Sequence, residues 1–317
     1  MSARILLNFL LFLLIAMSFY LSYPMKSAVI LYIPKGTTRE IITQLQSQNY
    51  DVSKVDAYIT RLFGFTQSGY IEMPSSTLSK GEFLYYLVKS KAATRKFTLI
   101  PGETSYFFLR DLASAYSFDE AKLELLYKLK FPYTDGVILA NTYNLPYSTN
   151  EQNLIDILYN ISMQEQKRLA IKLTGSYDEK KWFKVITKAS IIQKEAANIK
   201  EMPIISGVID NRIKIGMPLQ MDGSLNYGKY SHIRVTPERI QTDKTTFNTY
   251  KYLGLPKEPS GSVSIDAIKA ALNPSKVPYL YFMRNDKGTH DFSTTYQAHL
   301  SNVEKRQKTL DITDKAR

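Results

Sequence analysis

The chain has 317 residues, enough for about two domains, and 44% of them are hydrophobic, which excludes a largely disordered protein. It contains no cysteine, so disulfides, thiol nucleophiles and cysteine-based metal sites are excluded. The formal net charge of +12 suits an anionic partner, but the basic residues are spread along the chain, which argues against a nucleic-acid partner.

The first predicted element is a membrane-spanning helix over residues 5–23. From Ile5 to Ser22 the clearly polar side chains are Asn8 and two serines, and roughly 17–25 apolar residues cross the hydrocarbon core of a bilayer. A cleaved signal peptide is the alternative, but its apolar core usually has about 7–15 residues and precedes a small-residue cleavage site. Tyr23 and Pro24 do not form such a site, so we predict a single uncleaved anchor.

The charges beside the anchor bear on its orientation. Arg4 and the amino terminus lie on one side and Lys26 lies close on the other, a slight bias toward a cytoplasmic N-terminus. We therefore predict that residues 1–4 are cytoplasmic and that everything after Tyr23 lies outside the cytoplasm. For a cell with an inner membrane, this means a single-pass inner-membrane protein with its folded part in the periplasm.

Two similar strand–turn–helix segments follow. In the first, an apolar run ends in a turn at Pro34–Gly36, and Thr37 or Thr38 begins a helix. In the second, a strand over Phe97–Ile100 ends in a Pro-Gly turn, and Thr104 begins an amphipathic helix. The shared order of Ile-Pro, Gly and Thr suggests a duplicated unit; the alternative is that such junctions are simply common.

The remaining elements divide the chain after the anchor into two predicted domains. A strand at Gly69–Met73 and a helix opened near Ser79 complete a small α/β module over residues 27–95. Beyond it, helices are expected over residues 117–129, 150–173, 182–199, 203–214 and 264–272 and from residue 295, with a strand at 278–284. Because strands and helices do not alternate regularly, the predicted fold class is α+β, with a mixed α+β domain over residues 96–317.

One acid in the predicted helix over residues 182–199 needs an explanation. At 100° per residue, Gln193 lies within the apolar face, and Glu195 lies on its flank beside Ile192 and Ile199. An acid that loses hydration has a raised pKa, as a general acid for a poor leaving group requires. The alternative, which periodicity alone favours, is a glutamate that is solvated or paired with a lysine of the same helix.

Polar residues then accumulate in predicted loops. The stretch Val208–Gly228 contains amide, guanidinium, carboxyl and phenol groups of the kind that hydrogen-bond polyhydroxylated ligands: Asn211, Arg212, Gln220, Asp222, Asn226 and Tyr227. A phenylalanine- and tyrosine-rich stretch from residue 279 adds hydroxyl and imidazole groups.

Six motifs occur in a fixed order in this half of the chain. They are Ala-Ser-Ile-Ile-x-Lys-Glu at 189–195, Asn-Arg-Ile-x-x-Gly-Met-x-Leu-Gln-x-Asp at 211–222, Asn-Thr-Tyr-x-x-x-Gly-Leu-Pro at 248–256, Ala-Leu-Asn-Pro at 271–274, Tyr-Leu-Tyr-Phe at 279–282 and His-x-Phe-Ser-x-Thr-Tyr-x-x-His at 290–299. This set resembles the YceG-like family of membrane-anchored endolytic murein transglycosylases. The anchor and the module over residues 27–95, which is similar to the family's LysM-like module, extend the resemblance over nearly the whole chain.

The resemblance implies a reaction. Family members cleave the β-1,4 bond between N-acetylmuramic acid and N-acetylglucosamine in peptidoglycan without water, and leave a 1,6-anhydro end. The family's catalytic acid falls on Glu195, while Gln193 stands where many relatives carry a second glutamate. Ordinary glycosidases need two carboxylates, but one acid/base suffices when the nucleophile is the sugar's own hydroxyl. No cofactor and no metal ion are expected.

The resemblance also implies which polar residues bind the sugar or hold Glu195 in place: Gln220, Asp222, Tyr227, Asn248, Tyr250 and His290. Each of these, taken singly, is more often structural than catalytic; Asp222, for example, could cap a turn. The family's acidic Asp-Thr-Tyr motif appears here as Asn141-Thr142-Tyr143, and residues 257–264 replace a proline-rich turn.

Three functional readings follow from the sequence. The first is an enzyme that acts on peptidoglycan glycan strands and terminates nascent strands near the membrane, with peptidoglycan synthases as possible partners. The second is a non-catalytic envelope scaffold that binds glycan strands and recruits synthases. The third is a hydrolytic glycosidase, whose products would carry reducing ends.

Overall fold

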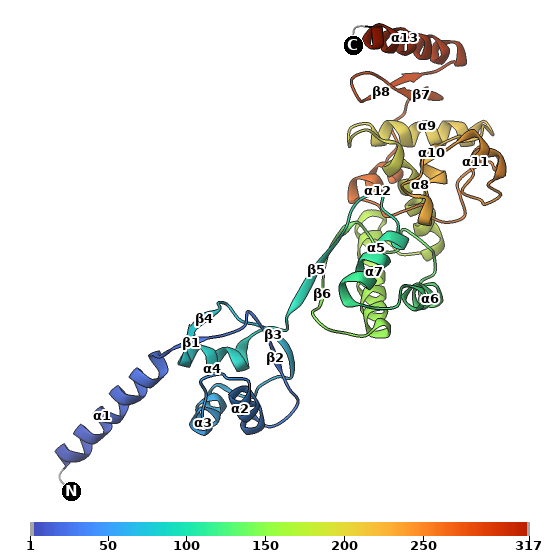
Figure 1. Ribbon diagram of the computed structural model, residues 1–317. Coiled ribbons are helices and arrows are strands. Elements are labelled where there is room, and N and C mark those ends of the chain that lie inside the picture. The colour runs from blue at the N-terminus through green and yellow to red at the C-terminus, as the bar shows by residue number, and fades with distance from the viewer. Residues whose placement is uncertain (1–2, 316–317) are drawn as a thin grey trace. The chain divides into compact units, whose positions relative to one another are not determined.

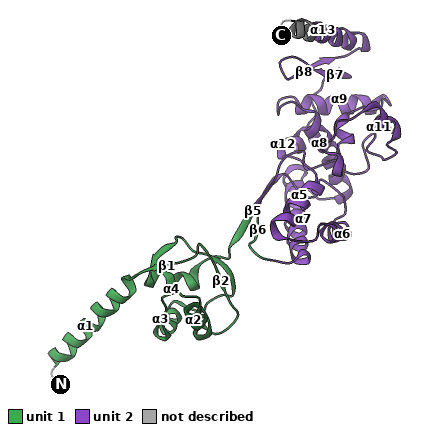
Figure 2. Ribbon diagram, viewed as in Figure 1, with its two compact units in different colours: residues 1–96, 144–148 green, residues 97–143, 149–317 purple. Residues whose placement is uncertain are grey.

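The computed structural model describes residues 3–315, with side chains described as far as residue 308 (Figure 1). It forms two compact units, which Figure 2 shows in different colours. The first unit comprises the residues up to Lys96 together with Asn144–Ser148, and the second unit comprises Phe97–Tyr143 and the residues from Thr149 onward. The predicted cytoplasmic segment, residues 1–4, lies partly outside the described residues.

The N-terminal helix α1 (Ala3–Ser22) has the length and composition expected of a membrane-spanning element. Within residues 3–315 it is the one helix long and apolar enough to cross a membrane, and none of its side chains is buried. This confirms the prediction of one N-terminal apolar helix. Only its end contacts the rest of the first unit, where Tyr20 and Leu21 pack against the core.

The first unit is built from short elements that follow α1 directly: β1 (Pro24–Lys26), β2 (Ile30–Ile33), α2 (Thr38–Ser47), α3 (Lys54–Phe63), β3 (Gly69–Glu72), β4 (Thr77–Ser79) and α4 (Lys80–Lys89). Strands β2 and β3 pair antiparallel, with Ile30 opposite Glu72 and Ile33 opposite Gly69. Strands β1 and β4 form a second antiparallel pair. The central order is therefore strand–helix–helix–strand.

Helices of the first unit begin where the sequence places good N-caps. Thr37 caps α2 in a capping box, because its N–H donates to Glu40 Oε2 at 2.8 Å and its hydroxyl accepts from the N–H of Glu40. Ser79 caps α4 in the same way with Glu82. Of the two predicted caps for α2, Thr37 is the one used.

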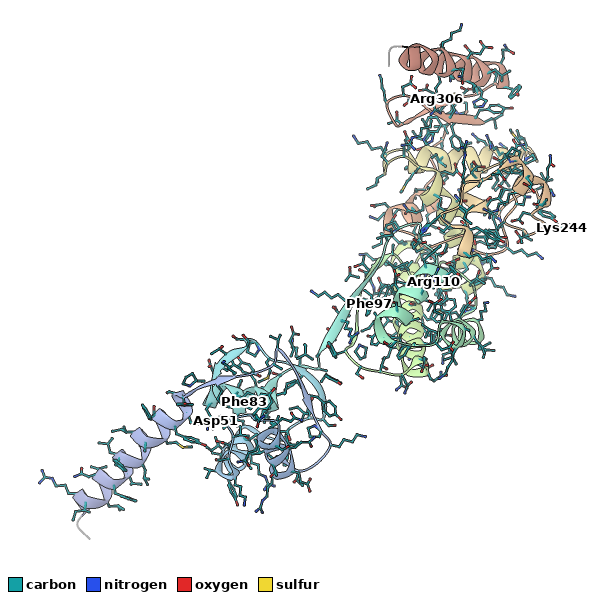
Figure 3. All side chains as sticks on the ribbon, viewed as in Figure 1. Asp51, Phe83, Phe97, Arg110, Lys244 and Arg306 are labelled. Carbon is teal, nitrogen blue, oxygen red and sulfur yellow. The ribbon has the colours of Figure 1, made fainter. Side chains whose placement is uncertain are left out.

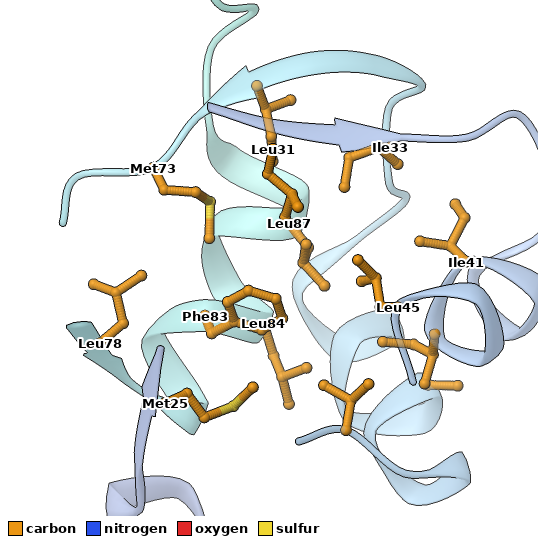
Figure 4. Close-up of a cluster of buried hydrophobic side chains, with 14 of the residues drawn as sticks. Met25, Leu31, Ile33, Ile41, Leu45, Met73, Leu78, Phe83, Leu84 and Leu87 are labelled. Carbon is orange, nitrogen blue, oxygen red and sulfur yellow. The ribbon is translucent and has the colours of Figure 1, made fainter. Parts of the chain in front are cut away.

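A single apolar core closes the first unit (Figure 4). Ile41 and Leu45, one turn apart on α2, face Leu84 and Leu87 of α4, and Phe83 is fully buried with them. Spacings of three and four residues place each set on one helix face, and burying each such side chain contributes about 1.5–3 kcal/mol. Phe83 lies inside the unit, whereas Asp51 lies on its surface (Figure 3).

The second unit is mainly helical. After the paired strands β5 (Thr94–Leu99) and β6 (Asn141–Pro146), within which the division between the units falls, its elements are α5 (Ser105–Tyr116), α6 (Glu120–Lys130), α7 (Glu151–Thr174), α8 (Glu179–Glu195), α9 (Met202–Lys214), α10 (Asp222–Leu225), the 3-10 turn η1 (Gly228–Tyr230), α11 (Pro237–Thr242), α12 (Ile265–Leu272), β7 (Tyr281–Arg284), β8 (His290–Ser293) and α13 (Tyr296–Lys315). This mixture confirms the predicted α+β class.

Helix α8 is held near its start and at its middle by polar side chains. Near its start, Trp182 Nε1 donates to Gln166 Oε1 at 2.6 Å, and the Gln166 amide donates to two backbone carbonyls of the 136–137 turn. Further along, Lys188 forms a 2.6 Å ion pair with Asp210 of α9 and also donates to the Ala271 carbonyl of α12. These contacts fix the direction in which α8 ends.

Several predicted boundaries differ from the structure: α8 begins at Glu179 instead of residue 182, and β7 at Tyr281 instead of residue 278. Two further differences have a clear physical cause. Helix α8 ends at Glu195 instead of residue 199, because the side chains of Asn198 and Glu201 accept backbone N–H groups that a longer helix would need. Ile199 is consequently exposed and does not crowd Glu195. Helix α6 begins three residues later than predicted, because Asp119 caps it at the N–H of Lys122.

Candidate active site

The last residue of α8, Glu195, meets the start of α10. Its Oε1 accepts a hydrogen bond from the N–H of Gly223 at 2.7 Å. A Cβ atom at position 223 would lie 2.7 Å from Lys194 Cβ and 2.9 Å from Glu195 Oε1, closer than real contacts allow. Only glycine therefore lets the backbone of α10 approach the carboxyl group this closely.

The surroundings of Glu195 favour its neutral form. Burial raises the pKa of Glu195 from 4.5 to about 7. The N–H of Gly223 has the opposite effect, because its hydrogen bond favours the charged form. The negative charge of Asp222 raises the pKa further, whereas the Arg212 guanidinium lowers it. The carboxyl terminus of α8 adds partial negative charge in the same direction as Asp222.

The hydrogen bond from Gly223 also decides where the proton lies. Because Oε1 accepts this N–H, the proton of the neutral acid resides on Oε2. Within residues 3–308 no protein group hydrogen-bonds to Oε2, and the side chain is only partly covered. The acid can therefore deliver its proton to a bound ligand and take one back.

Asp222 and Tyr250 stand beside this acid. The Tyr250 hydroxyl donates to Asp222 Oδ1 at 2.7 Å, and burial, together with this carboxylate, raises the pKa of Tyr250. The phenol thus remains a donor and orients the carboxylate. Asp222 is exposed, so its second oxygen is available to solvent or ligand.

Arg212 belongs to the site, although its sequence pattern marked it only as one of several polar residues. It is buried, and its Nε donates to the Leu280 carbonyl at 2.6 Å while its Nη1 bonds the Leu219 carbonyl. Both partners are uncharged, so the guanidinium charge remains available to act on Glu195. Its position in the Asn-Arg pair that opens the second motif was the available sequence signal.

Neither neighbouring lysine pairs with Glu195. Lys188 pairs with Asp210, and Lys194 donates to the carbonyls of Asn226 and, at 2.8 Å, Ser260. Burial lowers the pKa of Lys194 to about 8. Lys194 therefore ties the end of α8 to two loops, and the alternative of a salt-bridged Glu195 is wrong.

The Asn-Thr-Tyr segment at 248–250 fixes α10 against this end. Asn248 is fully buried; its amide donates to the carbonyls of Ile240 and Asp243 at 2.8 and 2.9 Å, and its oxygen accepts from the N–H of Tyr250. These three bonds engage both ends of the amide, so Asn248 holds the loop and is not placed to bind sugar. Thr249 binds Ser224 of α10 at 2.9 Å.

Gln220 and Tyr227 flank α10 on either side along the chain. Gln220 adopts a left-handed conformation with φ of 48° and has an exposed side chain. The Tyr227 hydroxyl donates to Asp243 at 3.0 Å and its ring stacks on Phe247, with 4.2 Å between centroids. Tyr227 also lines a hollow of about 370 Å³ whose other lining residues do not include Glu195.

His290 does not contact Glu195. Its Nδ1 hydrogen-bonds Glu201 Oε2 at 2.7 Å, and its backbone N–H donates to Oε1 of the same carboxyl at 2.9 Å. Glu201 also accepts the N–H of Ala197, just after the end of α8. His290 therefore anchors the turn that follows Glu195, through an acid that sequence reasoning missed.

Gln193 faces a different neighbour from Glu195. Its Oε1 accepts the N–H of Ser264, the N-cap of α12, at 3.1 Å. The two side chains, two residues apart near the end of α8, thus serve different contacts, as the helical geometry predicted.

A pH-dependent cost in stability follows from the raised pKa of Glu195. Below pH 4.5 the carboxyl is neutral in both the folded and unfolded chains, and between pH 4.5 and 7 only the unfolded chain ionises. Folding is therefore penalised increasingly up to about pH 7 and constantly above it. Glu195→Gln removes this penalty, so we expect it to raise the free energy of unfolding at pH 8 by on the order of 1–3 kcal/mol.

Thermal unfolding of the full chain in detergent at pH 4.5 and pH 8 measures this difference. The matched control, Glu238→Gln, changes an exposed glutamate of α11 and measures the effect of the same substitution away from the site. Equal differences between wild type and Glu195→Gln at both pH values would show that the pKa of Glu195 is not raised on folding.

The chain is similar to known proteins in both sequence and fold. The profile of the YceG-like family matches residues 31–305. A protein of Bacillus subtilis (strain 168) named endolytic murein transglycosylase is 32% identical over 182 residues, which cover 54% of this chain and 47% of that protein. A protein of the same name from Streptococcus pneumoniae (strain ATCC BAA-255 / R6) is 29% identical over 180 residues, covering 53% and 31%. These matches span less than half of each relative's length.

A crystal structure of a YceG-like protein from Listeria monocytogenes superposes with a TM-score of 0.54, covering 87% of this chain and 99% of that chain. At 21% identity this is a likeness of fold alone. Because the family profile spans most of the residues, from the first unit to α13, the chain belongs to the YceG-like family.

Proposed function

We propose that the chain is an endolytic peptidoglycan lytic transglycosylase that cleaves the β-1,4 bond between N-acetylmuramic acid and N-acetylglucosamine and leaves a 1,6-anhydro end. The observation that carries the proposal is the position of the Glu195 carboxyl: Gly223 holds its Oε1, its Oε2 bonds no protein group within residues 3–308, and burial raises its pKa to about 7. The six motifs and the names of the relatives from B. subtilis and S. pneumoniae support the substrate class.

In the proposed reaction one carboxyl does both proton transfers. Glu195 Oε2 gives its proton to the glycosidic oxygen as the bond from that oxygen to C1 of the muramyl residue breaks. The resulting carboxylate then takes the proton of the muramyl C6 hydroxyl as O6 bonds to C1. Glu195 regains its proton, no water is consumed and no second carboxylate is required.

The surrounding residues divide the remaining tasks. Asp222, exposed beside the acid, and Gln220, exposed two residues earlier in the chain, would bind sugar hydroxyls and acetamide groups, with Tyr250 orienting Asp222. The ring of Tyr227 offers an apolar face for a sugar. Asn248 and His290 would act only by holding the loops around Glu195, because their polar groups are engaged by protein.

The first unit fits the proposed location. We assign it as a LysM-like module over residues 27–95, supported by its strand–helix–helix–strand order with β2 and β3 antiparallel. Helix α1 would anchor the chain in the inner membrane as a single span with the folded units in the periplasm. There the enzyme would act on nascent glycan strands, with peptidoglycan synthases as partners.

The central prediction concerns products. Incubated with purified peptidoglycan, the detergent-solubilised wild-type chain is expected to create anhydromuramyl ends inside long strands, detected by mass spectrometry. Glu195→Gln cannot donate a proton, so we expect its rate to fall by a factor of at least about 100. Glu238→Gln, the matched glutamate change on the surface of α11, is expected to retain activity.

The two alternative hypotheses, a scaffold and a hydrolase, predict different products. A non-catalytic scaffold would bind strands without creating new ends, and a hydrolase would create reducing ends instead of anhydro ends. Anhydro ends formed equally fast by Glu195→Gln would remove the assigned role of Glu195.

The pH profile tests the charge balance at the site. Asp222→Asn removes the negative charge that raises the pKa of Glu195, so the loss of kcat/KM at alkaline pH should begin up to about one pH unit lower. Asp243→Asn, which weakens the hydrogen bond of Tyr227 away from the acid, should lower kcat/KM without changing the pH at which the alkaline loss begins. An unchanged onset of this loss in Asp222→Asn would mean that Glu195 is not the group that titrates.

The anchor has its own test. If α1 holds the active site near nascent strands, replacing residues 1–24 with a cleavable signal should release the enzyme and lengthen the glycan strands of the cell. Strand lengths can be measured by chromatography after removal of the stem peptides. Unchanged lengths at equal protein abundance would contradict the role of the anchor in termination.

A further inference from the structure

The end of α1 is built into the first unit without a linker. The Tyr20 hydroxyl donates to both carboxylate oxygens of Asp56 at 3.0 Å, and Lys80 Nζ donates to the same hydroxyl at 3.3 Å. Strand β1 begins at Pro24, only two residues after α1 ends. Because Asp56 lies in the first turn of α3, the start of α3 is fixed beside the last turns of α1.

Helix α3 and the residue after its cap expose a row of large apolar side chains. Val55, Tyr58, Leu62 and Phe65 are 58%, 69%, 82% and 81% exposed. The first three are spaced by three and four residues, which places them on one face, opposite the face that buries Asp56 and Thr60. An exposed apolar row of this size on a soluble unit marks an interaction surface.

Basic groups border the row. Lys54 and Arg61 lie on the exposed flank of α3, whose only acid, Asp56, is buried in the capping box. Beside them, a hollow of about 480 Å³ between α2 and α3 is lined by Arg39, Lys54 and Arg61, with Tyr58 and Phe65, and by no carboxylate. The surface therefore combines apolar and cationic groups, which suits an anionic lipid interface.

We propose that α3 docks on the outer surface of the membrane in which α1 is anchored. The side chains of Val55, Tyr58, Leu62 and Phe65 enter the headgroup region, and the basic groups bind the phosphates of anionic lipids. We assign the bilayer as the partner of this surface because the Tyr20–Asp56 contact holds the start of α3 beside the membrane end of α1. This inference rests on the proposed anchoring of α1 and is independent of the reaction at Glu195.

Docking of this kind would restrict the rotation of the first unit relative to the membrane. The two attachments, a spanning helix and an interfacial helix, would set its orientation on the membrane. The hollow between α2 and α3 would then face lipid headgroups and would not be open to a glycan strand.

The absence of cysteine allows a direct test on the full chain. Single variants Leu62→Cys and Phe65→Cys, labelled with a fluorophore, are reconstituted into vesicles of phosphatidylethanolamine and phosphatidylglycerol. We expect lipid-bound nitroxide, but not aqueous iodide, to quench both labels. Glu72→Cys, exposed on β3, serves as the aqueous control, and Phe12→Cys in α1 reports insertion of the anchor.

The pattern of quenching separates the possible failures. Suppose that iodide quenches the labels at 62 and 65 as strongly as the label at 72, while lipid-bound nitroxide quenches the label at 12. The docking proposal is then wrong, and the anchoring of α1 is still supported. If the label at 12 is also quenched by iodide, anchoring fails and docking fails with it. Neither result affects the test of Glu195 on detergent-solubilised protein.

A charge variant tests the chemistry of the partner. Each basic residue near an anionic surface strengthens binding about fivefold, so Lys54→Gln/Arg61→Gln should reduce the ratio of lipid-quenched to iodide-quenched label at 65 by roughly thirtyfold. Lys89→Gln/Lys91→Gln, a matched pair elsewhere on the first unit, should leave the ratio unchanged. Equal ratios for the two pairs would overturn the assignment to anionic lipid. So would protection of the label by glycan strands in place of vesicles.

Discussion

The hydrogen bond between the N–H of Gly223 and Glu195 Oε1 is the contact on which the site depends. It joins the end of α8 to the start of α10, and it exists only because residue 223 has no side chain. It leaves Oε2 as the oxygen that carries the proton, while burial raises the pKa of the carboxyl to about 7. The position of the proposed acid thus follows from one backbone contact, and its protonation follows from the burial around it.

The rest of the site serves to maintain this contact. Thr249 holds α10 through Ser224, and Lys194 ties the end of α8 to the carbonyls of Asn226 and Ser260. Arg212 is likewise held by backbone carbonyls, so its charge balances that of Asp222 without forming an ion pair with Glu195. Because both cations bond uncharged carbonyls, neither forms a direct salt bridge with the carboxyl, which would lower its pKa.

Local patterns in the sequence predicted local features of the structure. The apolar run gave α1, good capping residues gave the starts of α2 and α4, and helical geometry separated Gln193 from Glu195. What failed depended on specific side-chain contacts, some local and one distant. The end of α8 at Glu195 is set by side chains that bond the backbone after it, and His290 reaches this turn from 89 residues away, through Glu201. Periodicity contains no information about such contacts, and on periodicity alone Glu195 would be solvated or salt-bridged. Ile199, which the sequence placed beside Glu195, is exposed and plays no part in covering it.

The ionisation of Glu195 in the folded chain is the most direct test of this picture. A protonated carboxyl group has a carbonyl stretching band that disappears on ionisation, and the infrared difference between wild type and Glu195→Gln isolates this band from those of other acids. We predict that the band persists at pH 6 and is lost with a midpoint near pH 7. Loss of the band with a midpoint near pH 4.5, the ordinary value for a glutamate, would contradict the assignment of Glu195 as a proton donor at neutral pH.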